Sequence, residues 1–151
     1  MPQSFTCLHD HLIFSTKGRT PSIDSEIQAR LWEYLGGIVR NADGIAIQIG
    51  GTADHVHLLV SLRQDRALSD FMRELKAGAS GWIHDTFPHL SNFAWQAGYG
   101  AFTVSHSGLD VVKTYIATQE EHHRKLSYQD EFRAFLIKHG IEFDEKYLWD
   151  L

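Results

Sequence analysis

Two histidines separated by one residue are the most distinctive chemical feature of this 151-residue sequence. His55-Val56-His57 begins a segment, His55–Leu62, whose apolar residues alternate as in a half-buried strand. Val56, Leu58, Val60 and Leu62 then share the core side of the strand, and both histidines project from the other side. The strand rise places the two histidine Cα atoms about 6.5–7 Å apart. Two neutral imidazoles at this separation can bind one divalent ion, although a bare H-x-H pattern is a weak signal.

A second group of polar side chains follows one stripe of a predicted helix that runs from Leu109 to about Lys125. Tyr115, Gln119 and His122 recur on this stripe at three- and four-residue spacing, beside an apolar stripe that packs. A phenol, a neutral amide oxygen and an imidazole on consecutive turns form a poor packing face. The pattern therefore favours a functional surface over a simple core contact.

The first predicted strand contains another H-x-H sequence, His9-Asp10-His11. It competes with the pair at 55 and 57, because the first and third strands of the predicted sheet are neighbours. An alternative role for His11 is to lie behind the other pair and orient it, as groups next to metal ligands often do.

The elements that must position these residues alternate between strand and helix patterns. We expect strands at 5–15, 45–49, 55–62 and 99–105. We expect helices from Ser22 through Ile38, at 68–83, at 109–125 after a capping box at Ser107, and at 129–139. The order predicts an α+β fold, the ferredoxin-like or RRM-like βαββαβ antiparallel sheet with two extra C-terminal helices. The first extra helix carries Tyr115, and two helices cover one face of the sheet.

Composition narrows the class of protein. The chain has 43% hydrophobic residues, a net charge of −5 and one cysteine, which excludes an internal disulfide and a cysteine-built zinc site. No apolar run approaches the roughly 20 residues needed to span a bilayer, and the start lacks the features of a signal peptide. We therefore expect a single domain, 1–151, that is cytoplasmic and has no membrane contact. The acidic charge argues mildly against a non-specific coat on nucleic acid.

The sequence resembles the HUH single-tyrosine transposases of small insertion sequences and their REP-associated relatives. His55-Val56-His57 matches the HUH signature, and Tyr115-x-x-x-Gln119 matches the tyrosine motif. The likeness extends over nearly the whole chain in these blocks: HLIFSTKGR at 11–19, GGTADHVHLLVSL at 50–62, LKAGAS at 75–80, WQAGYGAFTVS at 95–105, YIATQEEHHRK at 115–125 and KHGIEFDEKYLW at 138–149.

The resemblance implies a site-specific endonuclease and strand transferase that acts on single-stranded DNA at hairpin-flanked element ends. It implies that His55, His57 and Gln119 bind Mg²⁺ or Mn²⁺ and that Tyr115 attacks the phosphodiester, giving a 5′-phosphotyrosine and a free 3′-OH. No ATP or other nucleotide cofactor is implied. It also implies a homodimer in which the tyrosine helix of one subunit can complete the site of the other. His122 and His11 are candidates for orienting groups, with His122 favoured over His123 because it shares the Tyr115 stripe.

Basic and aromatic side chains supply candidates for DNA contacts. These are Lys17, Arg19, Arg73, Lys76 and Lys113 for phosphates, and Trp95 for stacking on a base. For each basic residue a solvated helix or loop surface is an equal alternative.

Two other functions remain open at this point. One is a non-catalytic or domesticated module of the same fold that binds nucleic-acid hairpins through the open sheet face. The other is a replication-initiating or conjugative nuclease, which the chain length disfavours because such proteins carry further domains.

Overall fold

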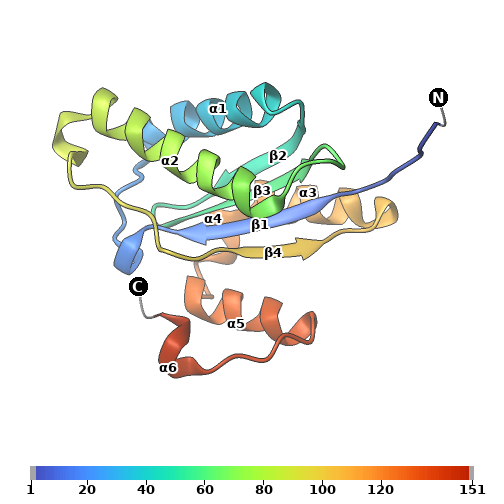
Figure 1. Cartoon of the computed structure of the whole chain (residues 1–151). Coiled ribbons are helices and arrows are strands. Elements are labelled where there is room, and N and C mark those ends of the chain that lie inside the picture. Colours follow the sequence, from blue (N-terminus) through green and yellow to red (C-terminus); the bar gives the residue numbers. More distant parts are fainter. Residues whose placement is uncertain (1–2, 150–151) are drawn as a thin grey trace.

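A four-stranded antiparallel sheet organises the computed structural model, which describes residues 3–149 (Figure 1). The strands are β1 (Asp10–Ser15), β2 (Ile45–Gly51), β3 (His55–Ser61) and β4 (Gly100–Thr103). Their order across the sheet is β2-β3-β1-β4, and every neighbouring pair is antiparallel. The prediction of an α+β fold is confirmed, and so is the expectation that the first and third strands are neighbours.

Two long helices, α1 (Ser25–Asn41) and α2 (Leu68–Thr86), lie together on one face of the sheet (Figure 1). The main core fills the space between them and the strands, where Leu31 and Leu35 of α1 meet Val56 of β3. Leu58 and Val60 belong to the same core, so the alternation in β3 has the predicted orientation. His55 and His57 must therefore face away from α1 and α2.

The C-terminal helices form a second layer on the histidine side. This part contains α3 (Leu109–Ala117), α4 (Gln119–His122), α5 (Tyr128–Lys138) and α6 (Glu145–Leu148), and Figure 1 shows α5 and α6 across the sheet from α1 and α2. A smaller apolar cluster joins Ile13 of β1 and Phe102 of β4 to Phe132 and Leu136 of α5. The face that α1 and α2 leave free is thus covered by the chain's own C-terminal segment.

Three short 3₁₀ turns lie in the connections, at Lys17–Arg19, Pro88–Leu90 and His106–Gly108. The last of these replaces the expected capping box, because α3 begins at Leu109 and no side chain caps it. Helix α1 is capped by Asp24, whose carboxylate accepts a hydrogen bond from the Ile27 amide at 3.0 Å, and not by Ser22. Residues 3–9 are not part of the sheet, although the His9 carbonyl accepts a hydrogen bond from the Val104 amide at 3.1 Å, so β1 begins at Asp10 and is shorter than predicted.

The expectation of one unbroken helix from Leu109 to Lys125 is wrong. The helix breaks at Thr118, which has φ −112° and ψ 29°. Both the backbone amide and the hydroxyl of Thr118 donate to the carbonyl oxygen of Thr114, at 3.1 and 2.8 Å. His122, beyond the break, still lies against the Tyr115 ring with centroids 4.5 Å apart.

Helix α3 is seated against the edge strand β2 at Gly50. A Cβ atom built on Gly50 would lie 2.5 Å from the carbonyl oxygen of Ile116, so only glycine allows this approach. Gly50 is the register partner of His57 on β3. The contact therefore fixes α3 directly beside the histidine pair.

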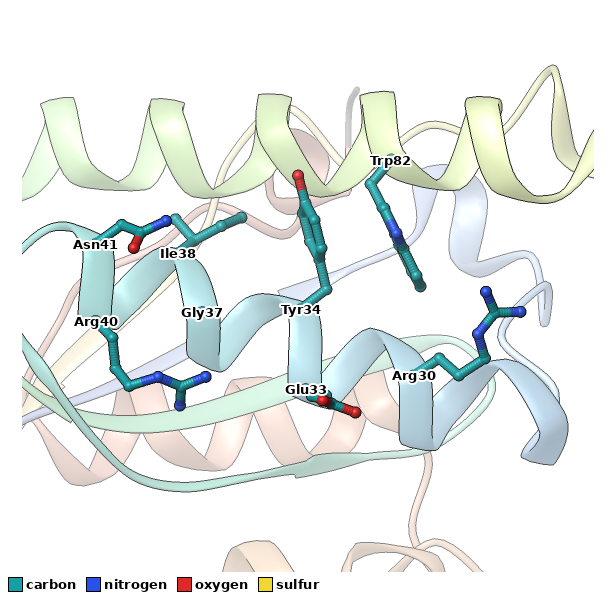
Figure 2. A pocket seen from close by; sticks show the side chains of 8 residues that line it. All are labelled: Arg30, Glu33, Tyr34, Gly37, Ile38, Arg40, Asn41 and Trp82. Carbon is teal, nitrogen blue, oxygen red and sulfur yellow. The ribbon is translucent and has the colours of Figure 1, made fainter.

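The opposite layer carries a surface pocket of about 390 Å³ along the outer side of α1 (Figure 2). Tyr34 of α1 and Trp82 of α2 stack there with ring centroids 4.8 Å apart. This pocket lies across the sheet from His55 and His57. No helix in the described part of the chain is long and apolar enough to cross a membrane.

Candidate metal and tyrosine site

The two β3 histidines are fully buried between the sheet and the C-terminal helices, and each has one ring nitrogen held from behind. His55 Nδ1 lies 2.7 Å from Asp54 Oδ1 and 3.0 Å from the Thr52 hydroxyl. His57 Nδ1 lies 2.8 Å from Nε2 of His11. Such contacts fix the ring orientation, as they do for histidines that bind metals. Both Nε2 atoms are left to face the C-terminal helices.

Helices α3 and α4 bring Gln119 and Tyr115 to these nitrogens. Gln119 Oε1 lies 3.0 Å from His55 Nε2, and the Gln119 side chain is buried. The Tyr115 ring lies edge-on to His57 with centroids 5.9 Å apart. The structure thus brings together, within one chain, the four residues that the sequence singled out.

Two further side chains enter the same cluster, His123 and Glu131. His123 Nε2 lies 3.1 Å from Gln119 Oε1 and 3.2 Å from Glu131 Oε2. Glu131 Oε1 lies 2.9 Å from His57 Nε2, and its other oxygen accepts the hydrogen bond of the Tyr115 hydroxyl. Sequence reasoning missed Glu131 because it is one acid in an acidic stretch. His122 was favoured over His123 because it shares the Tyr115 stripe, whereas the structure brings His123 into the cluster.

His122 lies instead against the Tyr115 ring, with centroids 4.5 Å apart, and contacts the Thr118 hydroxyl at 3.2 Å. Because the helix breaks at Thr118, His122 does not reach the group formed by His55, His57, His123 and Glu131.

Burial and hydrogen bonding set the protonation of the cluster. Burial lowers the pKa of His57 to about 4 and that of His11 to about 3, so both rings are neutral near pH 7. Burial alone would raise the pKa of Glu131, but hydrogen bonds from His123, His57 and Tyr115 outweigh it and hold that pKa far below the ordinary value. Burial and the bond to Glu131 raise the pKa of Tyr115. The resting phenol is therefore protonated.

The donor atoms fit a small divalent cation. Octahedral ions such as Mg²⁺ hold oxygen and nitrogen ligands at about 2.1 Å, which puts adjacent ligands about 3.0 Å apart. The potential ligand atoms of the cluster have similar spacing. Glu131 Oε1 lies 2.9 Å from His57 Nε2 and 3.6 Å from His55 Nε2, and Glu131 Oε2 lies 3.2 Å from His123 Nε2. Gln119 Oε1 lies 3.0 Å from His55 Nε2 and 3.1 Å from His123 Nε2. Imidazole nitrogens with amide and carboxylate oxygens suit Mn²⁺ and Mg²⁺. The cluster can hold such an ion without rearrangement of the backbone.

Two of the residues expected to contact DNA have other partners in the structure. Trp95 is 8% exposed and packs edge-on against Phe14 and Phe93 in the main core, so its ring has no free face for a base. Lys76 donates to the carbonyl oxygens of Gln96, Ala97 and Gly98, and burial lowers its pKa to about 8. Lys76 therefore braces the loop before β4.

The other four basic candidates keep accessible side chains. Lys17 and Lys113 are exposed, and Arg19 lies over the Trp149 ring at 5.4 Å. Arg73 pairs with Asp70 at 3.2 Å on the exposed surface of α2.

Comparison with known proteins identifies the class to which this fold and site belong. Residues 4–119 match the family model described as "Transposase IS200 like", which is about three quarters of the chain. The chain therefore belongs to the IS200-like transposase family, a class of DNA-processing enzymes. The match ends at Gln119, so His123, Glu131 and helix α5 lie beyond the matched segment.

Individual relatives agree with this assignment. The ISDra2 transposase TnpA of Deinococcus radiodurans is 28% identical over 119 residues, covering 76% of this chain and 85% of the relative. The crystal structure of a D. radiodurans R1 protein assigned as a transposase superposes with a TM-score of 0.65 at 25% identity, covering 79% and 96% of the two chains. A REP-associated tyrosine transposase bound to a REP hairpin shares the fold, with a TM-score of 0.59 at 15% identity and coverage of 82% and 74%.

Proposed function

We propose that this protein is a metal-dependent transposase that cleaves and rejoins single-stranded DNA through Tyr115. One observation carries the proposal: the Tyr115 side chain lies beside a buried cluster of His55, His57 and Gln119 whose donor atoms converge at ligand spacing. His55, His57 and Gln119 are the proposed ligands of Mg²⁺ or Mn²⁺, and Tyr115 is the nucleophile.

The Tyr115 oxygen attacks the scissile phosphorus in line with the 3′ oxygen. The bond between phosphorus and that 3′ oxygen breaks, and the departing oxygen takes up a proton from water, which leaves a 5′-phosphotyrosine and a free 3′-OH. A bound Mg²⁺ or Mn²⁺ supplies charge neutralisation at the phosphate and a template for its orientation. Attack by a second 3′-OH on the phosphotyrosine restores the tyrosine and joins the strands. The phosphoester is conserved throughout, so no ATP is needed.

The phenol must lose its proton as it attacks, since a neutral phenol is a weak nucleophile. Glu131 accepts the hydrogen bond of this hydroxyl, so the proton already points toward a carboxylate. The rigid cluster positions the phenol before substrate arrives, and such positioning contributes much of the rate in phosphoryl transfer.

The substrate we propose is single-stranded DNA with hairpins at the ends of a mobile element. The membership in the IS200-like family and the hairpin-bound neighbour of the same fold support it. Lys17, Arg19, Arg73 and Lys113 are the proposed phosphate contacts, because their side chains remain accessible. We place the activity in the cytoplasm, where the chromosomal DNA of a prokaryotic cell lies.

The resemblance to dimeric transposases also supports a homodimer. Within one chain, however, α3 already brings Tyr115 to His57, so a dimer need not exchange helices to complete its sites. The non-catalytic hairpin module is disfavoured because the sheet face it would use is covered by α5, with Phe102 only 4% exposed.

Formation of a covalent adduct tests the proposal. The protein is incubated with Mn²⁺ and labelled single-stranded oligonucleotides from the flanks of its own gene, and denaturing gels reveal protein–DNA species. We expect an adduct that EDTA abolishes and that Tyr115→Phe lacks. Tyr147→Phe, which alters an exposed tyrosine on α6, is the matched control and should retain the adduct. An adduct with Tyr115→Phe would show that the nucleophile is another residue.

A further inference from the structure

We propose that Glu131 of helix α5 is a direct ligand of the divalent ion and also the residue that holds the Tyr115 hydroxyl in place. One carboxylate oxygen would serve the ion and the other would serve the nucleophile. The inference deepens the proposed function and rests on it for the identity of the nucleophile. It adds an anionic ligand to a site whose other proposed ligands, His55, His57 and Gln119, are all neutral.

The two oxygens of Glu131 have different neighbours. Oε1 lies 2.9 Å from His57 Nε2 and 3.6 Å from His55 Nε2, facing the nitrogens that β3 presents. Oε2 lies 3.2 Å from His123 Nε2 and accepts the hydrogen of the Tyr115 hydroxyl. A single carboxylate therefore touches both the proposed ion site and the proposed nucleophile.

The carboxylate of buried Glu131 is held by two histidines and a phenol, and by no permanently charged side chain. It is 2% exposed and is the one carboxylate among the buried polar side chains of residues 3–149. The ion pairs found in this part of the chain link Glu131 to histidines alone, with no lysine or arginine. A buried carboxylate without a strong cation is costly to maintain. A divalent ion bound at Oε1 would place a permanent positive charge beside this carboxylate.

Its neighbours on the same segment behave differently. Asp130 and Glu145 are exposed and pair with Arg133, and Glu142 and Asp144 are exposed on the following loop. Helix α5 thus points Glu131 inward and leaves Asp130, its other acid, in solvent. The Ser127 hydroxyl caps the helix by accepting from the Asp130 amide at 3.1 Å, which fixes the start of α5 one turn before Glu131.

The position of Glu131 in the chain has a functional consequence. The IS200-like family model matches residues 4–119, so Glu131 belongs to a segment outside that match. In this chain the segment folds back over the histidine face and contributes to the site. Metal binding would thereby couple α5 to β3, and the same carboxylate would keep Tyr115 at a fixed distance from the ion.

Binding of Mn²⁺ without DNA tests the ligand role directly. Isothermal calorimetry compares the full-length protein with Glu131→Gln, which keeps the size of the side chain and removes its charge. We expect the affinity for Mn²⁺ to fall about 100-fold, the upper end of the loss seen when groups that merely orient ligands are removed. Glu120→Gln, an exposed acid beside Gln119, is the control for net charge and should bind as the wild type does.

The positioning role has a separate readout. At saturating Mn²⁺, Glu131→Gln should still form less adduct than wild type, because the Tyr115 hydroxyl then faces a neutral amide oxygen in place of a carboxylate. Tyr115→Phe should bind Mn²⁺ with wild-type affinity, since the phenol is not a ligand. Glu131→Asp, which keeps the charge on a shorter side chain, should recover part of the Mn²⁺ affinity. Thermal unfolding in EDTA establishes that each variant is folded.

The outcomes separate this inference from the proposed function. Equal Mn²⁺ affinity for wild type and Glu131→Gln would overturn the ligand role and leave Tyr115 chemistry intact. Weaker Mn²⁺ binding together with an adduct on Tyr115→Phe would retain the ligand role and overturn the nucleophile. If neither Glu131 variant folds, wild-type protein with ¹³C-labelled glutamate decides: Mn²⁺ should broaden one carboxyl signal far more than the others, and uniformly sharp signals would refute the proposal.

Discussion

Replacement of Gly50 by alanine should displace the nucleophile without touching it. The new Cβ would lie 2.5 Å from the carbonyl oxygen of Ile116, whereas ordinary contacts begin at 3.4 Å, so α3 must retreat by about 0.9 Å. Tyr115 precedes Ile116 and moves with it. A misplacement of about 1 Å can lower a rate about 100-fold. We therefore expect adduct formation by Gly50→Ala to be about 100-fold slower than by wild type.

The same overpacking should cost stability. Forcing a methyl group into a filled contact costs about 1–3 kcal/mol, and the lower backbone entropy of alanine returns about 0.5–1 kcal/mol. Urea unfolding followed by tryptophan fluorescence should thus show a net loss of at most about 2.5 kcal/mol. This loss is too small to unfold an ordinary domain, so slow adduct formation would report displacement of α3.

Gly81→Ala is the matched control. Gly81 lies in the middle of α2 on the exposed side, and a Cβ there meets no atom within 4 Å. Alanine should stabilise the helix by up to about 1 kcal/mol and leave adduct formation unchanged. Wild-type rates for Gly50→Ala would refute the reasoning, because they would mean that α3 does not rest on β2 in the active enzyme.

Three further outcomes follow from the site and its charges. A mixture of the Tyr115→Phe and His57→Ala proteins should form no adduct, since each chain lacks one residue of its own site. Adduct formation in the mixture would show that the two subunits of a dimer share sites. Acid should destabilise the protein, because the pKa of His57 is about 4 in the fold and 6.5 when unfolded. Below pH 6.5 the unfolded state therefore binds more protons than the folded state, and the free energy of unfolding falls as the pH falls toward 4. His57 alone accounts for a loss of about 2 kcal/mol at pH 5. Urea unfolding at pH 7.5 and pH 5 should show this loss, and equal stability at both would contradict it. Lys113→Ala should weaken binding of single-stranded DNA and reduce the salt slope by about one in a filter-binding titration, and an unchanged slope would exclude Lys113 as a phosphate contact.

The strand pattern was sufficient to predict how the histidines are oriented. Alternation in His55–Leu62 sets which side chains face α1 and α2, and period-two geometry leaves no other choice once Leu58 and Val60 are buried. The long helices were equally predictable, since their apolar stripes are continuous. The N-terminal cap of α1 was harder to predict from the sequence. Ser22 and Asp24 are both good capping residues, and the folded chain uses Asp24.

The cluster was only partly predictable, because its last members depend on tertiary structure. The helix breaks at Thr118, and beyond the break His123 Nε2 lies 3.1 Å from Gln119 Oε1. Glu131 has no local signal at all, since its neighbour Asp130 is exposed and sequence alone does not say which acid turns inward. Trp95 was misjudged for the same reason, as its burial depends on Phe14 from a distant strand.

Because His11 contacts His57, the tautomer of the His11 ring should depend on whether an ion is bound at His57. Because Glu131 is an anionic acceptor, His57 carries its hydrogen on Nε2, and its Nδ1 must accept from Nε2 of His11. A cation on Nε2 of His57 would force both imidazoles into their other tautomer, with no change in net charge. Nitrogen chemical shifts of His11 would then register occupancy from a ring that never touches the ion.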